Sequence, residues 1–500
     1  MSKTFKRLTA VVLLLVTILS MTACADRRAE KELQKLLNTQ AVKVGDYTLN
    51  AVELNYFFVD AVVEWYNANG SMSHLMGFDP GKPLNEQIIS SATGETWADS
   101  FLDTALKNAQ STYAMYDQAM KAGFTLSRDM RLDVDSLIKN LQSTIDYYKK
   151  LYESMGYDYP YTDVAGYLTS TYGTGADATS YQKYYEICTI ANAYYSHYAD
   201  SLTFDSKALR AYEADKYHKY CSYSYQVYYL SVAQFEDAAE AEKVANALAS
   251  GYYAGKDAFD AAIKELAINK DVENPTLSTE MTDQVYSKLP SYYNEWLADT
   301  GREEGHMTVA KHPDLNDKTK TQGYYVVRYV GMNRNEFILQ NIRQVYCAFQ
   351  GGTSNAITGE ITFSKVEKEN ARQKAEKMYV EFRTGSMSEL VFGNMADMYS
   401  DASAPGGLYE NLLPGQLDQV VEDWANDPIR MAGDVEMIQG KRGWHIVYFV
   451  SHSKLTYRDY LVTQDLKADT ISAWYDALMD SMKPELLSDT YVNKAMVIGQ

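Results

Sequence analysis

Apolar residues recur at helical spacing over residues 365–383, which predicts an amphipathic helix there. The run 342–349 before this helix and the run 443–450 well after it are rich in β-branched and aromatic residues, as strands are. Residues 341–450 are therefore expected to form one unit that opens and closes on a strand. The apolar face of the helix consists of Ala371, Ala375, Met378 and Phe382.

Turn and helix signals divide the segment between those two strands. Residues 390–400 are predicted to form a second helix, and a tight turn is expected at 401–408, where Gly406 and Gly407 are adjacent. A third, short helix is predicted for residues 418–426. The order is then strand, helix, helix, double-glycine turn, short helix and strand.

This order, closing on Gly-x-His-Ile, resembles the parvulin family of peptidyl-prolyl isomerases over about 110 residues. In that family, two histidines on neighbouring central strands lie beside an Asp or Cys, above an apolar pocket for the proline ring. The resemblance implies rotation about X-Pro peptide bonds, a reaction that needs neither a metal nor a cofactor. The motifs that carry the resemblance are Tyr399-Ser400-Asp401, Gly406-Gly407-Leu408, Gly415-Gln416-Leu417 and Gly443-Trp444-His445-Ile446-Val447.

Only part of the family's site is present at the matching positions. The resemblance implies that His445 is the histidine of the last strand, whereas the first-strand histidine corresponds to Gln344 and the Asp or Cys to Ala402. Asp401 is expected to turn inward as a substitute, which makes His445, Gln344 and Asp401 the candidate catalytic set. Because glutamine cannot change charge near neutral pH, turnover is expected to be weakened or lost. The implied pocket residues are Leu408, Leu417 and Val421, the last where phenylalanine is usual.

A degenerate copy of this pattern lies nearer the N-terminus than residues 341–450, offset from them by about 118 to 120 residues. The alignment places Gln226 at the position of Gln344 and Tyr325 at the position of His445. Since the copy lacks the double-glycine turn and the polar set, we expect it to be inactive. The matching stretches are 224–229 with 342–347 and 323–330 with 443–450.

Helical patterns dominate the chain before this copy. One long helix is predicted over 457–482, after the strand at 443–450. This arrangement resembles that of SurA-like and PrsA-like secretion foldases, in which the C-terminal segment packs back on the N-terminal domain. The predicted class is α+β. The predicted parts are a lipoprotein signal peptide (1–23), a tether (24–40), a helical chaperone domain (41–220), a degenerate parvulin-like unit (221–335), a parvulin-like isomerase domain (336–453) and a C-terminal helical segment (454–500).

The first 23 residues have the features of a secretory leader. A basic stretch at 3–7 precedes an apolar run of about twelve residues, too short to span a hydrocarbon core of about 30 Å comfortably. Met21-Thr22-Ala23-Cys24 resembles the lipobox of bacterial lipoproteins, which implies lipidation of Cys24 and a membrane-anchored, extracytoplasmic protein. An ordinary cleaved leader is the alternative.

Charge and motif content exclude several functions. The leader holds three of the 47 basic residues and none of the 66 acidic ones, so the chain without it has a net charge of −22, which argues against nucleic-acid binding. The histidines form no metal motif, and no phosphate-binding loop is present, so no metal or cofactor is expected. The three cysteines that remain are predicted to be buried free thiols, with a Cys188–Cys221 bridge left open.

The sequence therefore predicts a membrane-anchored foldase whose partners are unfolded or newly secreted polypeptides. The 43 tyrosines can serve such binding at a surface or can pack the helices that carry them. One alternative is a surface-displayed binding lipoprotein with one fixed partner and no folding role. Another is an isomerase whose primary role is turnover.

Overall fold

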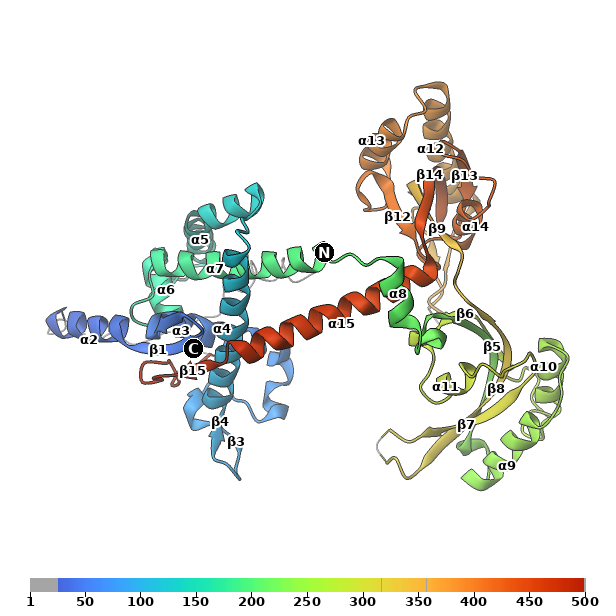
Figure 1. Ribbon diagram of the computed structural model, residues 1–500, viewed down its shortest axis with the longest axis horizontal. Helices are drawn as coiled ribbons and strands as arrows, with labels where there is room; N and C mark the ends of the chain where they lie inside the picture. Colours follow the sequence, from blue (N-terminus) through green and yellow to red (C-terminus); the bar gives the residue numbers. More distant parts are fainter. Residues whose placement is uncertain (1–25, 316, 357, 499–500) are drawn as a thin grey trace. The chain divides into compact units, whose positions relative to one another are not determined.

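The computed structural model describes residues 26–498 apart from 316 and 357. The chain falls into two compact units, one built from Met1–Thr203 with Lys467–Gln500 and the other from Phe204–Leu466. The first unit is mainly helical and the second holds two four-stranded sheets (Figure 1), which confirms the predicted α+β class. The predicted signal peptide and the predicted lipidation site Cys24 lie outside the described residues.

Helices between residues 26 and 201 supply most of the apolar core of the first unit. Their starts are set by local capping: at α3, the Asn50 side chain accepts a hydrogen bond from the N–H of Glu53 (3.0 Å), and the Glu53 carboxylate accepts one from the N–H of Asn50 (2.9 Å). The helices are α2 (Asp26–Asn38), α3 (Ala51–Asn69), α4 (Trp97–Lys121), α5 (Arg128–Ser154), α6 (Val164–Tyr172) and α7 (Ala178–Ser201).

Many tyrosines of this unit pack inside it. Tyr56 lies 5.0 Å from Tyr172 and 5.1 Å from Tyr184, measured between ring centroids, and the hydroxyls of Tyr172 and Tyr184 both donate to the carboxylate of Asp60. Others, such as Tyr147, are exposed. The tyrosines of this unit are therefore divided between packed and exposed positions.

The C-terminal segment packs on this helical unit, as predicted. Its strand β15 (Pro484–Leu486) pairs with β1 (Gln40–Val44), which pairs with β2 (Tyr47–Asn50). Trp474, from the part of α15 (Tyr457–Ser481) that belongs to this unit, stacks on Tyr198 with centroids 3.9 Å apart.

The second unit contains two sheets of the same topology, which we name the first and second sheet modules. The first module orders its strands as β6 (Thr279–Val285), β5 (Ser222–Ser231), β8 (Thr321–Asn333) and β7 (Met307–Pro313). The second orders them as β12 (Leu408–Leu412), β9 (Ile338–Ala348), β14 (Gly443–Thr456) and β13 (Val435–Gln439). All neighbouring strands are antiparallel.

Helices cover both faces of the second module. Side chains of α12 (Lys365–Thr384) and α13 (Glu389–Tyr399) pack on one face, against Val345 and Ile446. The short helix α14 (Gln419–Ala425) packs on the other face, against Val447 and Phe449. In the first module, α9 (Ala238–Ala249) and α10 (Lys256–Lys264) share one core cluster, and α11 (Asn294–Leu297) contributes to the other.

One local arrangement recurs in both modules and fixes their alignment. The Arg302 guanidinium lies 4.4 Å from the centroid of the Trp296 ring, and Arg430 lies 4.5 Å from that of Trp424. In each case the arginine Nε also donates to the carbonyl of that tryptophan, at 2.9 and 3.1 Å. Because the arginine follows the tryptophan by six residues in both copies, α11 corresponds to α14.

The strands show that the sequence alignment of the repeat is wrong by one residue on the first strand. In the first module, Tyr229 lies against Gly323 and 4.9 Å from Tyr325; in the second, Tyr346 lies against Gly443 and 4.8 Å from His445. Tyr229 therefore corresponds to Tyr346. It follows that Val227, not Gln226, corresponds to Gln344.

Gln226 lies on the opposite face of the first module. Its side chain accepts a hydrogen bond from Arg328 (3.3 Å), and both residues are buried. Successive strand residues point to opposite faces, so a shift of one position moves a side chain to the wrong side of the sheet.

Candidate functional site

His445 lies on the central strand β14, on the face that α14 covers. It is directly opposite Tyr346 of β9 and is 4% exposed. Two residues further along the same face, Val447 is opposite Gln344. The pairing of β9 with β14 thus brings Gln344 and His445 together, although 101 residues separate them in the chain.

Both ring nitrogens of His445 have a polar partner. Nδ1 lies 2.8 Å from Oε1 of the Gln344 amide, and Nε2 lies 2.9 Å from Oδ2 of Asp418. The other end of the Gln344 amide lies 3.5 Å from the hydroxyl of Tyr409. These four side chains form a row that we name the His445 row: Tyr409, Gln344, His445 and Asp418.

Asp418 is held in place by the loop between β13 and β14. The N–H of Lys441 donates to its carboxylate (3.1 Å), and Gly440 lies so close that an added Cβ would collide with both Asp418 and the His445 ring. Asp418 precedes α14 at the N-cap position, but its side chain makes no capping hydrogen bond. Its carboxylate is directed at His445 instead.

Two opposing effects act on the proton affinity of His445. Burial lowers its pKa below the usual 6.5, because a charged imidazolium loses hydration, whereas the hydrogen bond and charge of Asp418 act in the opposite direction. Burial is the larger effect, so the pKa is lowered overall. His445 is therefore neutral at neutral pH.

An apolar wall lies on the same face as the His445 row. Leu417 and Val421, both implied by the parvulin resemblance, belong to it, and Tyr409 packs against it. Val421 is fully buried and Leu417 partly buried. The buried members of the wall are Ile342, Leu412, Val421, Trp424, Ala425, Val447 and Phe449.

A buried carboxylate shapes the loop that carries Leu417. Glu422 of α14 is 4% exposed and accepts hydrogen bonds from the N–H of Leu417 (2.8 Å) and the N–H of Gly415 (3.0 Å). This bonding ties the turn to α14, so Leu417 and Asp418 leave the turn in fixed directions.

Leu408 is not on this face. It pairs with Arg343, whose neighbour Gln344 points to the other side of the sheet, whereas Tyr409 pairs with Ile342 of the apolar wall. The structure therefore brings Tyr409, not Leu408, to the site.

Asp401 is also directed elsewhere. Its carboxylate forms an ion pair with Lys374 (2.9 Å) and accepts a hydrogen bond from the N–H of Ala348 (2.9 Å). Its own N–H donates to the carbonyl of Tyr346 (2.8 Å). The expected inward turn is not seen, and Asp418 occupies the place of the polar partner.

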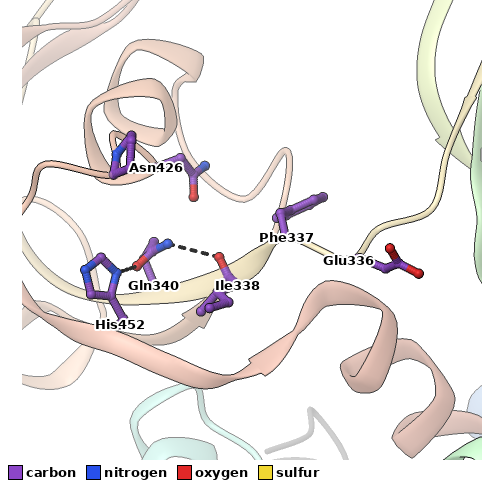
Figure 2. A pocket seen from close by; sticks show the side chains of 7 residues that line it. Glu336, Phe337, Ile338, Gln340, Asn426 and His452 are labelled. Atoms are coloured by element: carbon purple, nitrogen blue, oxygen red, sulfur yellow. Dashed lines mark hydrogen bonds between the residues drawn. The ribbon is translucent and has the colours of Figure 1, made fainter.

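A hollow of about 620 Å³ lies at the far end of the same sheet, where β9 begins and β14 ends. Figure 2 shows His452 bonded through Nδ1 to Gln340 (2.8 Å), and Gln340 donating to the carbonyl of Ile338 (2.9 Å). Phe337 and Pro428 add apolar surface. None of the lining residues belongs to the His445 row, so this is a separate feature.

The described part of the chain holds no cluster of three or more potential metal ligands. Among its described residues, no helix has the length and apolar character needed to cross a membrane. Cys188, Cys221 and Cys347 are free thiols; Cys221 and Cys347 are buried and Cys188 is partly so.

Residues 356–451 match the family model of the rotamase, or PPIC-type PPIase, domain. The second sheet module is parvulin-like. The match includes His445, Asp418 and the apolar residues of α14. It begins after β9 and so leaves Gln344 outside. The parvulin-like module therefore joins a family-type last strand to a first strand that carries glutamine.

Comparisons with curated proteins and with solved structures add no second family match. No curated protein matches the sequence. Among solved structures, one chain described in a study of PEB4 and Cj1289, two SurA-like chaperones of Campylobacter jejuni, matches at 14% identity over 59% of this chain and 83% of that one. The TM-score of 0.14 means that the two whole chains do not superpose.

Proposed function

We propose that this protein is an extracytoplasmic, membrane-anchored folding factor whose parvulin-like module binds prolyl segments of unfolded polypeptides and isomerises them slowly. One observation carries the proposal: in a module that matches the PPIC-type family, His445 and the apolar wall with Leu417 and Val421 share one face. The remaining residues determine how well such a site can work.

Rotation about an X-Pro bond faces a barrier of about 18–20 kcal/mol and takes tens to hundreds of seconds without a catalyst. A catalyst must bind the twisted amide more tightly than the planar one. An apolar wall can hold the proline ring, and a hydrogen-bond donor near the peptide carbonyl or nitrogen can favour the twisted form. The His445 row lies beside Leu417 and can supply such a donor through the Tyr409 hydroxyl.

Slow turnover follows from the composition of the row. Gln344 replaces a group that could be charged by one that stays neutral, and Ala402 removes a second polar position. Asp418 partly compensates, since it holds the His445 ring from the other side. We therefore expect the site to bind prolyl segments but to isomerise them slowly.

The helical unit is proposed to hold unfolded clients. It exposes long apolar side chains, and methionine in particular adapts to varied partners because its side chain is flexible. The exposed residues on the connection from α3 to α4 are Met72 (57%), Leu75 (76%), Met76 (50%), Ile88 (60%) and Ile89 (44%). Anchoring through Cys24 would place this surface at the membrane where secreted chains emerge.

Two assays on the full chain test the proposal. Refolding of a model protein limited by proline isomerisation should accelerate when the chain is added, and aggregation of an unfolded client should decrease without ATP. His445→Ala should lower the first effect and leave the second within about twofold. Equal loss of both would contradict the division between the parvulin-like module and the helical unit.

Breadth of binding separates this proposal from a receptor role. A folding factor should bind several unrelated unfolded chains weakly and release them when they fold. Tight binding of one folded ligand, with no effect on unfolded chains, would instead favour the surface-displayed binding lipoprotein.

A further inference from the structure

The chemistry of Asp418 fixes the direction of one hydrogen bond in the His445 row and links the others to the charge of the ring. The Asp418 carboxylate can only accept, so Nε2 of His445 carries a proton. A neutral ring then has no proton on Nδ1, which needs a donor. A charged ring has one there as well, and Nδ1 then needs an acceptor.

The Gln344 amide can meet either demand. A half-turn about its last torsion exchanges Oε1 and Nε2 without changing the shape of the side chain. Gln344 is 3% exposed, lies 2.8 Å from Nδ1 of His445, and lies 3.5 Å from the Tyr409 hydroxyl at its other end. Whichever group faces His445, the opposite group faces Tyr409.

The two arrangements give the Tyr409 hydroxyl opposite directions. With His445 neutral, the Gln344 NH₂ donates to Nδ1 and its oxygen accepts from the Tyr409 O–H. With His445 charged, the Gln344 oxygen accepts from Nδ1 and its NH₂ donates to the Tyr409 oxygen. Both ends of the Gln344 amide are paired in each arrangement, whereas the charged arrangement leaves the Tyr409 O–H without an acceptor in the row.

We propose that protonation of His445 turns the Gln344 amide and so frees the Tyr409 O–H to donate to a bound prolyl peptide. Tyr409 is the group that meets the peptide, because it packs against the apolar wall with Leu417. Gln344 and Asp418 are positioning residues. This inference depends on the proposed function, because it assigns the donor of that same site.

The groups around His445 allow both states to be reached. Asp418 approaches from the start of α14, Tyr346 stacks on the ring from β9, and Tyr409 acts from β12 through Gln344. The β13–β14 loop contributes the N–H of Lys441, which bonds to Asp418. Arg442 and Asp401 act on Tyr346, with opposite signs. Burial lowers the pKa of His445 while Asp418 raises it, and burial has the larger effect.

The amide turn is tested by ¹⁵N spectra of the full chain labelled in histidine, with His445 assigned by comparison with His445→Ala. We expect the Nε2–H tautomer at neutral pH and one titration below pH 6.5. Gln344→Glu has the same shape but can only accept, so the His445 pKa should rise by about 1–3 units. An Nδ1–H tautomer at neutral pH, or an unchanged His445 pKa in Gln344→Glu, would contradict the proposed rotation of the Gln344 amide.

The role of Tyr409 is tested by the pH dependence of prolyl-peptide isomerisation and binding. Activity should rise as the pH falls through the His445 titration. Tyr409→Phe should lower it by about three- to tenfold and abolish this rise, leaving the His445 titration in place. The matched control is Tyr399→Phe, which changes an exposed tyrosine of α13 in the same module.

The outcomes separate the two ideas. A Tyr409→Phe profile identical to that of the unaltered chain overturns the donor role while leaving the proposed function intact. If the full chain neither binds nor isomerises prolyl peptides at any pH, the proposed function fails and the donor role with it. The imidazole spectra decide the amide turn independently of turnover.

Discussion

The two sheet modules share a strand order, a helix arrangement and the Trp–Arg contact, but they differ where a client would bind. Three members of the His445 row, namely Gln344, His445 and Asp418, are replaced in the first module by apolar or aromatic residues. The corresponding pairs, first module before second, are Val227 and Gln344, Tyr325 and His445, and Pro290 and Asp418. A buried polar group without a partner costs about 1–3 kcal/mol, so such a row is stable when it is kept or lost as a set.

Aromatic packing fills the place of the row in the first module. Tyr325 lies 5.8 Å from Tyr292 and 5.4 Å from His312, and Tyr229 bonds to Nδ1 of His312 (3.1 Å). Tyr293 stands where the second module has Val421. The comparison teaches that one backbone supports a hydrogen-bonded polar row or a packed aromatic cluster, depending on three side chains.

The largest expected effect tests whether the two modules are built alike. Gly443→Ala and Gly323→Ala would each drive a Cβ into a tyrosine ring and into a carbonyl of the adjacent strand. Each should lower the free energy of unfolding by about 3 kcal/mol, measured by denaturant titration. Gly331→Ala on β8, where an added Cβ has no close neighbour, is the control. A large effect in one module only would break the correspondence.

Exchange of the site residues tests the functional difference. His445→Tyr should lower prolyl isomerisation by about tenfold or more, because the ring that Gln344 and Asp418 hold is lost. Tyr325→His should create no activity, because its neighbours would be Val227 and Pro290. The triple change Val227→Gln, Pro290→Asp and Tyr325→His should add a histidine titration below pH 6.5 to the ¹⁵N spectrum. Activity from Tyr325→His alone would show that the row is unnecessary.

The pH dependence of stability should also separate the modules. The lowered pKa of His445 means that the folded state binds fewer protons than the unfolded state as the pH falls below about 6.5. The second module should therefore lose stability in that range, by less than about 1.4 kcal/mol per pH unit for one group. Hydrogen exchange of β14 amides, compared with those of β8 and corrected for intrinsic rates, measures this. His445→Gln should remove the difference.

The smallest effect concerns the pocket position that the sequence misplaced. Leu417→Ala should weaken prolyl-peptide binding by about three- to tenfold, because it opens the apolar wall. Leu408→Ala should change binding by less than about twofold, since its strand partner is Arg343 on the far face. A stronger effect from Leu408→Ala in a calorimetric titration would contradict the observed register.

Much of the fold could be predicted from the sequence because periodicity reports burial directly. The apolar face of α12, with Ala371, Ala375, Met378 and Phe382, is buried as its spacing predicts. The strands that hold Gln344 and His445 pair as expected. The face of the sheet to which each strand residue points was harder to predict. A shift of one residue at Leu408 or Gln226 moves the side chain to the other face without changing the composition of the strand.

Asp418 was missed for a different reason. An aspartate just before a short helix is the usual signature of an N-cap, so its position suggests a local role. Its real partner, His445, follows 27 residues later and reaches it through the close approach of Gly440. Only the folded β13–β14 hairpin brings the two together, and the order of residues gives no sign of it.

Glu422 has a mechanical consequence for this site. Because its buried carboxylate holds the amides of Gly415 and Leu417, the turn is tied to α14, and we expect any displacement of one to carry the other with it. Lifting this joined piece from the sheet to admit a bulky chain would withdraw Asp418 from the imidazole and Leu417 from the proline ring in the same step. Under the proposed function, a client that required this movement would meet the two groups together only after the piece had returned to the sheet.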